Sequence, residues 1–288
     1  MYHAPPMPPA PPMLPDVDSV RRDDYQRHFF MSRLPKQDGD VSKTTSPEVV
    51  QARLIKTLAV ECKLRKAFDG KVHASTVEFD SPASTLPHCT IIAVLRFLGV
   101  PEVFLDFFTR ALEPKLRIKV STHDAARCIT PKGGVSVGNG LEMLFSEAVL
   151  FFLELATRKV TGSYMYRLYD HCYFVGTDVQ TKHAEEAAAR FSSVMGLTLR
   201  NTSSTDKLSI GSLAMSLQAT SPHDISVTFA IDDPKVALYA AKAESRLKSC
   251  STVLEWIREW NNTVGTYAAH LFDPLADVFD TTHRETVK

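Results

Sequence analysis

The chain contains 288 residues, of which 44% are hydrophobic and 23% charged, and its 33 Lys and Arg residues balance 33 Asp and Glu residues. This length can bury the core of one large domain or two small ones, and the composition is that of an ordinary globular protein. A zero net charge argues against tight binding of nucleic acid through a broadly basic surface, although it allows a local basic groove.

The cysteines and the apolar segments both indicate an intracellular protein, either cytoplasmic or nuclear. The five cysteines occur singly and predict free thiols in a reducing compartment. The N-terminus lacks the basic start and apolar run of a secretory signal. The most apolar stretch, Leu141 to Ala156, carries three carboxylates, which favours a buried helix with one polar edge over a membrane span.

The N-terminal part predicts a tail followed by one long helix. Residues 1–15 are about half proline and indicate a disordered or polyproline II tail, which we extend to residue 20. A polar loop over 38–47 follows. Ser46 fits the N-cap and Pro47 the first position of a helix that runs to about Phe68 and ends at Asp69-Gly70.

The next segment predicts a strand, two helices and a short hairpin. Val72 to Asp80 alternates as a strand, with Ala74, Thr76, Glu78 and Asp80 on one face. Apolar helices are expected after Pro87, up to Gly99, and from Pro101 to about Pro114. Short strands at 116–120 and 128–130 precede a turn at 132–134 and the apolar helix 141–157.

The C-terminal half begins with the segment that matters most for function. Residues 164–177 form two β-prone runs joined by a two-residue break, which predicts a β-hairpin with Asp170 at its tip. An alanine-rich helix over 182–195, a strand over 208–217 and an amphipathic helical segment over 233–262 follow. Trp256 and Trp260 are four residues apart on a helix, and we expect them to pack in the core rather than stack on bases.

Three carboxylates form a candidate site for a divalent cation. If the strands pair, the acidic strand end at Glu78 and Asp80 lies beside Asp170. Carboxylates that meet in this way ionise cheaply only when a cation lies between them, and Mg²⁺ prefers oxygen ligands. Two such ions about 4 Å apart stabilise the attacking and leaving oxygens in phosphoryl transfer. We therefore predict Asp170, Glu78 and Asp80 as catalytic metal ligands; the alternative is an ordinary turn and a solvated strand face.

Four segments resemble, in order, motifs A to D of the reverse-transcriptase family, which includes telomerase: VEFDSPASTLPH at 77–88, GGVSVGNGLEMLF at 133–145, YRLYDHCYF at 166–174 and MGLTLRN at 195–201. The chain is also similar to fungal reverse-transcriptase-like proteins at 27–35, 86–108 and 255–261. The resemblance implies an α+β fold with an antiparallel palm sheet packed on helices. It implies partial fingers at 21–70, the palm at 71–215 and a helical, thumb-like segment at 216–288.

The chain departs from the family pattern in three of the four motifs. Asp170-His171 stands where the family has two aspartates, and a register anchored at 86–88 puts Glu78 at the catalytic position of motif A. Ser136 replaces the proline of motif B, and the lysine of motif D has no clear counterpart. In the motif B loop, the resemblance makes Gly134, Ser136 and Lys132 candidate nucleotide-binding residues. The glycine is equally explained as a turn residue, since no Walker-type lysine and hydroxyl pair follows.

Two functions follow from the resemblance. The first is an Mg²⁺-dependent RNA-directed DNA polymerase that uses deoxynucleoside triphosphates. The second is a catalytically inactive relative that binds RNA, an RNA–DNA hybrid or a protein partner. The altered motifs and the zero net charge favour the second, and a globular protein without polymerase ancestry is a third reading.

Overall fold

The computed structural model describes residues 16–35, 47–80, 82–118, 127–135, 140–204, 207–211, 213–221 and 224–265. The proline-rich tail over 1–15, the expected N-cap Ser46 and the candidate ligand-binding residue Ser136 lie outside these ranges. No helix in the described ranges is long and apolar enough to cross a membrane.

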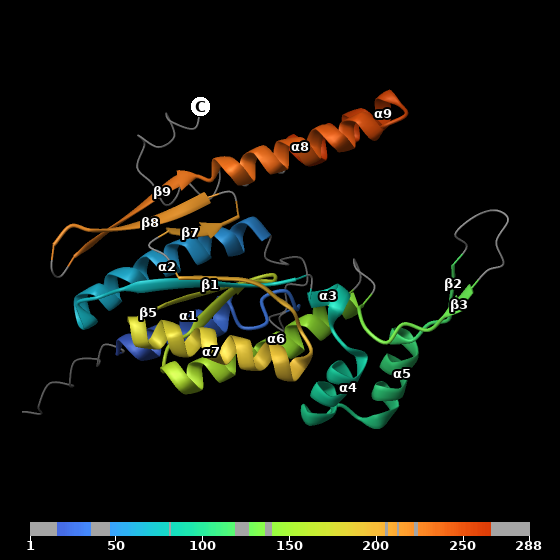
Figure 1. Cartoon of the computed structure of the whole chain (residues 1–288), viewed down its shortest axis with the longest axis horizontal. Helices are drawn as coiled ribbons and strands as arrows, with labels where there is room; N and C mark the ends of the chain where they lie inside the picture. Colours follow the sequence, from blue (N-terminus) through green and yellow to red (C-terminus); the bar gives the residue numbers. More distant parts are fainter. Residues whose placement is uncertain are drawn as a thin grey trace, which may run out of the picture.

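The described chain has the expected α+β fold, with antiparallel sheets packed on helices (Figure 1). Its central sheet has the strand order β4-β5-β1-β6, and each neighbouring pair is antiparallel. The strands of this sheet are β1 (His73–Phe79), β4 (Met165–Leu168), β5 (His171–Gly176) and β6 (Leu199–Ser204). The helices of the N-terminal and middle parts are α1 (Val17–His28), α2 (Pro47–Asp69), α3 (Pro82–Thr85), α4 (His88–Phe97), α5 (Glu102–Leu112), α6 (Gly140–Thr161) and α7 (Asp178–Met195).

The central sheet is covered on both faces. Figure 1 shows α2 on one side of it and α6 and α7 on the other. Side chains alternate along β1 as the sequence predicts, because successive residues of a strand point to opposite faces. Ala74 joins the hydrophobic cluster that contains α2, whereas Val77 and Phe79 join the cluster that contains α4, α6 and α7.

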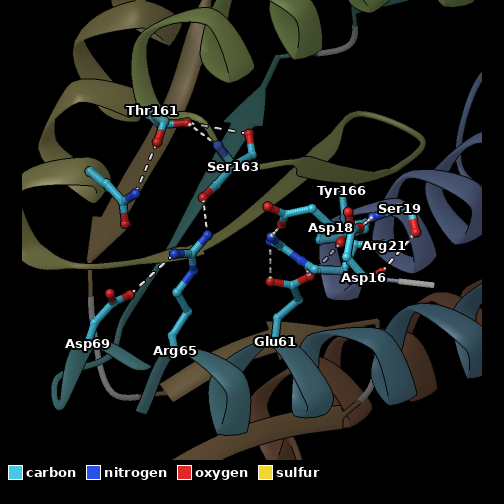
Figure 2. A network of polar contacts seen from close by, with 11 residues as sticks. Asp16, Asp18, Ser19, Arg21, Glu61, Arg65, Asp69, Thr161, Ser163 and Tyr166 are labelled. Carbon is cyan, nitrogen blue, oxygen red and sulfur yellow. Dashed lines mark hydrogen bonds and ion pairs between the residues drawn. The ribbon is translucent and has the colours of Figure 1, made fainter. Parts of the chain in front are cut away.

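Helix α1 was not predicted, and it corrects the expected tail, which extended to residue 20. Asp16 caps the helix by accepting a hydrogen bond from the backbone N–H of Ser19. Figure 2 shows how the helix is fixed to its neighbours. Arg21 donates hydrogen bonds of 2.7 and 2.8 Å to the Glu61 carboxylate in α2, and the Tyr166 hydroxyl of β4 donates one of 3.0 Å to the same carboxylate.

Most helices and hairpins of the middle part are confirmed. Helices α4, α5, α6 and α7 lie where expected, and Gly196 ends α7 in the left-handed conformation with φ +70°. The predicted short hairpin consists of β2 (Leu116–Ile118) and β3 (Arg127–Ile129). The one-turn helix α3 was not predicted.

The strand predicted over 208–217 is wrong, because this segment contains two strands. Gly211, with φ +62°, reverses the chain between β7 (Lys207–Ile210) and β8 (Leu213–Ala219). Strand β9 (Ile225–Ile231) completes a three-stranded sheet that shares the α2 cluster. The expected limit between palm and thumb at 215/216 therefore falls inside β8, and the segment after it is not helical throughout.

The C-terminal helices are α8 (Asp233–Ser249), α9 (Val253–Trp260) and the π-helical turn η1 (Asn261–Gly265). They extend beyond β9, away from the central sheet (Figure 1). All residues of α8 and α9 are described, and none is buried. The prediction that Trp256 and Trp260 pack in the core is wrong: they are 42% and 44% exposed, with ring centroids 5.2 Å apart in a stacked pair.

Candidate catalytic centre at the β4–β5 hairpin tip

The predicted hairpin carries Asp170 to the end of β1. Tyr169 and Asp170 form the turn between β4 and β5, and Tyr169 has φ +58°. A left-handed conformation is uncommon for a bulky residue and must be held by its surroundings. The backbone N–H of Phe79 donates a 3.3 Å hydrogen bond to the Asp170 carbonyl, and Glu78 lies opposite His171 in the strand register. Segments more than ninety residues apart in the chain therefore meet at this tip.

The ring of His171 lies between two of the three predicted metal ligands. Its Nδ1 is 3.2 Å from Oε1 of Glu78, and its Nε2 is 3.7 Å from Oδ1 of Asp170. Nδ1 is buried, and it makes no hydrogen bond of good geometry with the described residues. All three side chains are partly exposed, at 22% for Glu78, 34% for His171 and 38% for Asp170.

Asp80, the third predicted ligand, lies in a different environment from Glu78 and Asp170. Its backbone N–H donates a 2.9 Å hydrogen bond to the Thr198 carbonyl, and its own carbonyl accepts one of 3.3 Å from the Thr85 hydroxyl. The residue itself is exposed. The contacts described for Asp80 are thus made by its backbone, and they connect it to the start of β6 and to α3 rather than to Asp170.

The described residues at the tip do not fit a divalent metal. Nowhere in the described ranges do three or more His, Cys, Asp or Glu side chains form a group that could hold a metal ion. Mg²⁺ requires ligand oxygens at about 2.0–2.1 Å in near-octahedral geometry. Oε1 of Glu78 and Oδ1 of Asp170 each face a nitrogen of the His171 ring, so the ring takes up the contacts that a shared ion would make.

A cavity of about 360 Å³ opens beside the hairpin tip. Arg33, Glu142 and Tyr169 line it: the Arg33 guanidinium makes hydrogen bonds of 3.1 and 3.2 Å to Glu142 and lies 5.4 Å from the centroid of the Tyr169 ring. Ser146 also lines the cavity, and its buried hydroxyl has no hydrogen-bond partner among the described residues. The other lining residues are Pro82, Ala83, Ser84, Leu150 and Asp170.

Gly134 and Lys132, predicted to bind a nucleotide, do not line this cavity and have local partners. The Gly134 N–H donates a 2.9 Å hydrogen bond to the Leu86 carbonyl, and its own carbonyl is 2.8 Å from Nε2 of His88. Lys132, whose side chain is 79% exposed, pairs with Glu113 at 3.4 Å. These contacts fasten the motif B loop to the start of α4. His88, which anchors the loop, was not predicted.

A buried ionic network supports the hairpin, and sequence reasoning missed it. Arg167 of β4 donates hydrogen bonds of 2.7 and 2.8 Å to Glu147, one of 2.8 Å to Glu154, and one of 3.3 Å to the Tyr169 carbonyl. The Tyr25 hydroxyl donates to Glu154. Burial lowers the pKa of Arg167, but the two carboxylates raise it by more, so that the guanidinium stays charged. The two glutamates one heptad apart on an apolar helix were the available signal.

No protein-family model and no curated protein matches the sequence. Solved structures of Candida tropicalis telomerase do resemble the fold. The apo enzyme truncated from its C-terminal domain matches 74% of this chain and 45% of its own at 11% identity, with a TM-score of 0.50. The enzyme in complex with a TWJ fragment of telomeric RNA matches 88% of this chain and 45% of its own at 14% identity, also with a TM-score of 0.50. The chain spans less than half the length of these telomerase chains. Its fold is remotely similar to the reverse-transcriptase-type fold of telomerase.

Proposed function

We propose that this protein is a non-catalytic reverse-transcriptase-like palm that binds RNA, alone or paired with DNA, at the β4–β5 hairpin tip. One observation carries the proposal: the imidazole of His171 lies between Glu78 and Asp170, where a polymerase needs converging carboxylates. Two-metal catalysis requires ions that hold both the attacking and the leaving oxygen. A misplacement of about 1 Å costs on the order of a hundredfold in rate, and a whole ring intervenes here.

RNA as the ligand is supported by the fold and by the surface of the tip. One of the telomerases with the same fold was solved with a fragment of telomeric RNA. At the tip, Tyr169 is 43% exposed and its ring lies beside the Arg33 guanidinium. Single-stranded RNA is bound by stacking its bases on aromatic rings and arginine planes, while cationic groups face the phosphates. Tyr169 and Arg33 offer both groups at one place.

Replacing Tyr169 with Ala is expected to weaken RNA binding about tenfold, because a base–aromatic stack contributes about 1–3 kcal/mol and 1.4 kcal/mol is a factor of ten. Fluorescence anisotropy with a labelled 12-nucleotide RNA and with an RNA–DNA hybrid measures the change. Binding should persist in EDTA and weaken with rising salt.

The matched control is Phe68→Ala. Phe68 is 71% exposed and lies near the start of β1, whereas the hairpin tip lies at the end of this strand. The control variant should bind RNA as the intact protein does. Equal losses in both variants, or binding by neither RNA probe, would count against the hairpin tip as the RNA site.

Polymerase activity is the alternative, and the position of Asp170 favours it. This residue lines the cavity at the hairpin tip, as a metal-binding aspartate of motif C would. In this alternative, Asp170, Glu78 and Asp80 hold Mg²⁺ and the cavity takes a deoxynucleoside triphosphate. For the metal and the nucleotide to bind in this way, His171 must leave its position and Asp80 must turn toward the tip.

A further inference from the structure

We infer that His171 takes the place of a divalent cation at the hairpin tip, so that the intact protein binds none there and loss of this one ring opens a cation site. This inference concerns the same site as the proposed function and deepens it. Its biological meaning rests on the proposed function, but the absence of a cation at the tip does not. The position of the ring itself is given by the strand register and two distances.

The strand register fixes which side chain faces which. Glu78 and His171 are opposite each other on the antiparallel strands β1 and β5. Directly opposite residues have Cβ atoms about 4.5–5.5 Å apart and share one face of the sheet. Strand β5 is paired on both sides, with β4 and with β1, so residue 171 cannot shift without breaking the centre of the sheet.

The two ring nitrogens face different carboxylates. Nδ1 is 3.2 Å from Oε1 of Glu78, and Nε2, the second nitrogen bonded to Cε1, is 3.7 Å from Oδ1 of Asp170. A single Mg²⁺ ion needs its oxygen ligands at about 2.0–2.1 Å, so an ion cannot bridge the two carboxylates while the ring keeps its position. The ring therefore fills the gap that an ion would fill in a competent centre.

An acidic residue in place of His171 changes the donor set. A carboxylate at 171 would lie opposite Glu78 and next to Asp170, which brings three carboxylates to one strand end. Such a group is stable when ionised only with a cation among its members. Asp80 need not contribute to this site, which depends on Glu78 alone among the residues of β1.

Mn²⁺ binding, measured by electron paramagnetic resonance of the free ion, tests the inference without any activity assay. The intact protein should take up Mn²⁺ no more tightly than Glu78→Gln does. His171→Asp should bind one Mn²⁺ at least tenfold more tightly, and the double variant His171→Asp with Glu78→Gln should lose that gain. Circular dichroism and urea unfolding establish that each variant is folded.

His171→Asn keeps the test decisive where the acidic variant does not fold. It removes the ring and supplies an amide oxygen without adding charge, and it should also bind Mn²⁺ more tightly than the intact protein. A Glu78-dependent Mn²⁺ site in the intact protein would overturn the inference, as would folded variants that bind no better than the intact chain. RNA anisotropy on the same samples reports separately on the proposed function, since its failure would leave the Mn²⁺ result unchanged.

Discussion

Arg167→Met is expected to lower the free energy of unfolding by about 3–5 kcal/mol, because it breaks a buried ionic network. The side chains of Arg167, Glu147 and Glu154 are 4%, 0% and 4% exposed, so the variant would leave two carboxylates buried without their cation. Methionine has a similar length and fills the space, which confines the effect to the charge. Urea unfolding followed by circular dichroism measures the loss.

Lys182→Met is the matched control for this variant. Lys182 pairs with Asp178 at 2.8 Å, but both side chains are more than half exposed, so water already solvates the charges. The control should unfold at nearly the same urea concentration as the intact protein. If Arg167→Met also unfolded at nearly the urea concentration of the intact protein, the buried network would not be what holds the β4–β5 hairpin on α6.

Gly134→Ala is expected to destabilise the protein by about 3 kcal/mol or more, for two separate reasons. Gly134 has φ +81°, and a left-handed conformation costs an L-residue about 1–2 kcal/mol. In addition, an added Cβ would lie 2.5 Å from the Ser84 carbonyl oxygen, a backbone atom that cannot rotate away.

Gly99→Ala separates these two effects. Gly99 has φ +85°, almost the same as Gly134, but an added Cβ would meet no atom within 4 Å. Only the conformational cost of about 1–2 kcal/mol should appear in its urea unfolding curve. Equal losses at the two glycines would mean that the motif B loop can move away from Ser84, and the close packing of this loop would then not explain Gly134.

Local sequence patterns predicted the elements that carry their own signals. Alternation placed β1, the two-residue break placed the β4–β5 hairpin, and Gly196 placed the end of α7. Helix α1 lacks such a pattern: its sequence is mostly polar and only Tyr25 is buried. Its stability comes instead from contacts to Glu61 and Glu154 that lie far away in the sequence. Strands β7 and β8 were predicted as one strand, because the sequence did not show that Gly211 adopts a positive φ and reverses the chain.

In the candidate site, residue types predicted which residues meet but not how their side chains are arranged. The sequence predicted that Glu78 and Asp170 would lie close to one another, and strand pairing does bring them to one place. It could not indicate that the His171 ring would lie between them, because this depends on side-chain rotamers. It also placed Asp80 on the face of Glu78, since it extended the strand by one residue, whereas β1 ends at Phe79.

Primer extension tests most directly whether this palm is catalytic. The full chain is incubated with a primed RNA template, deoxynucleoside triphosphates and a series of Mg²⁺ or Mn²⁺ concentrations, and Asp170→Ala is assayed beside it. With His171 between Glu78 and Asp170, we expect no extended primer at any concentration of either metal. Extension by the intact protein that disappears in Asp170→Ala would contradict this account and establish the protein as a polymerase.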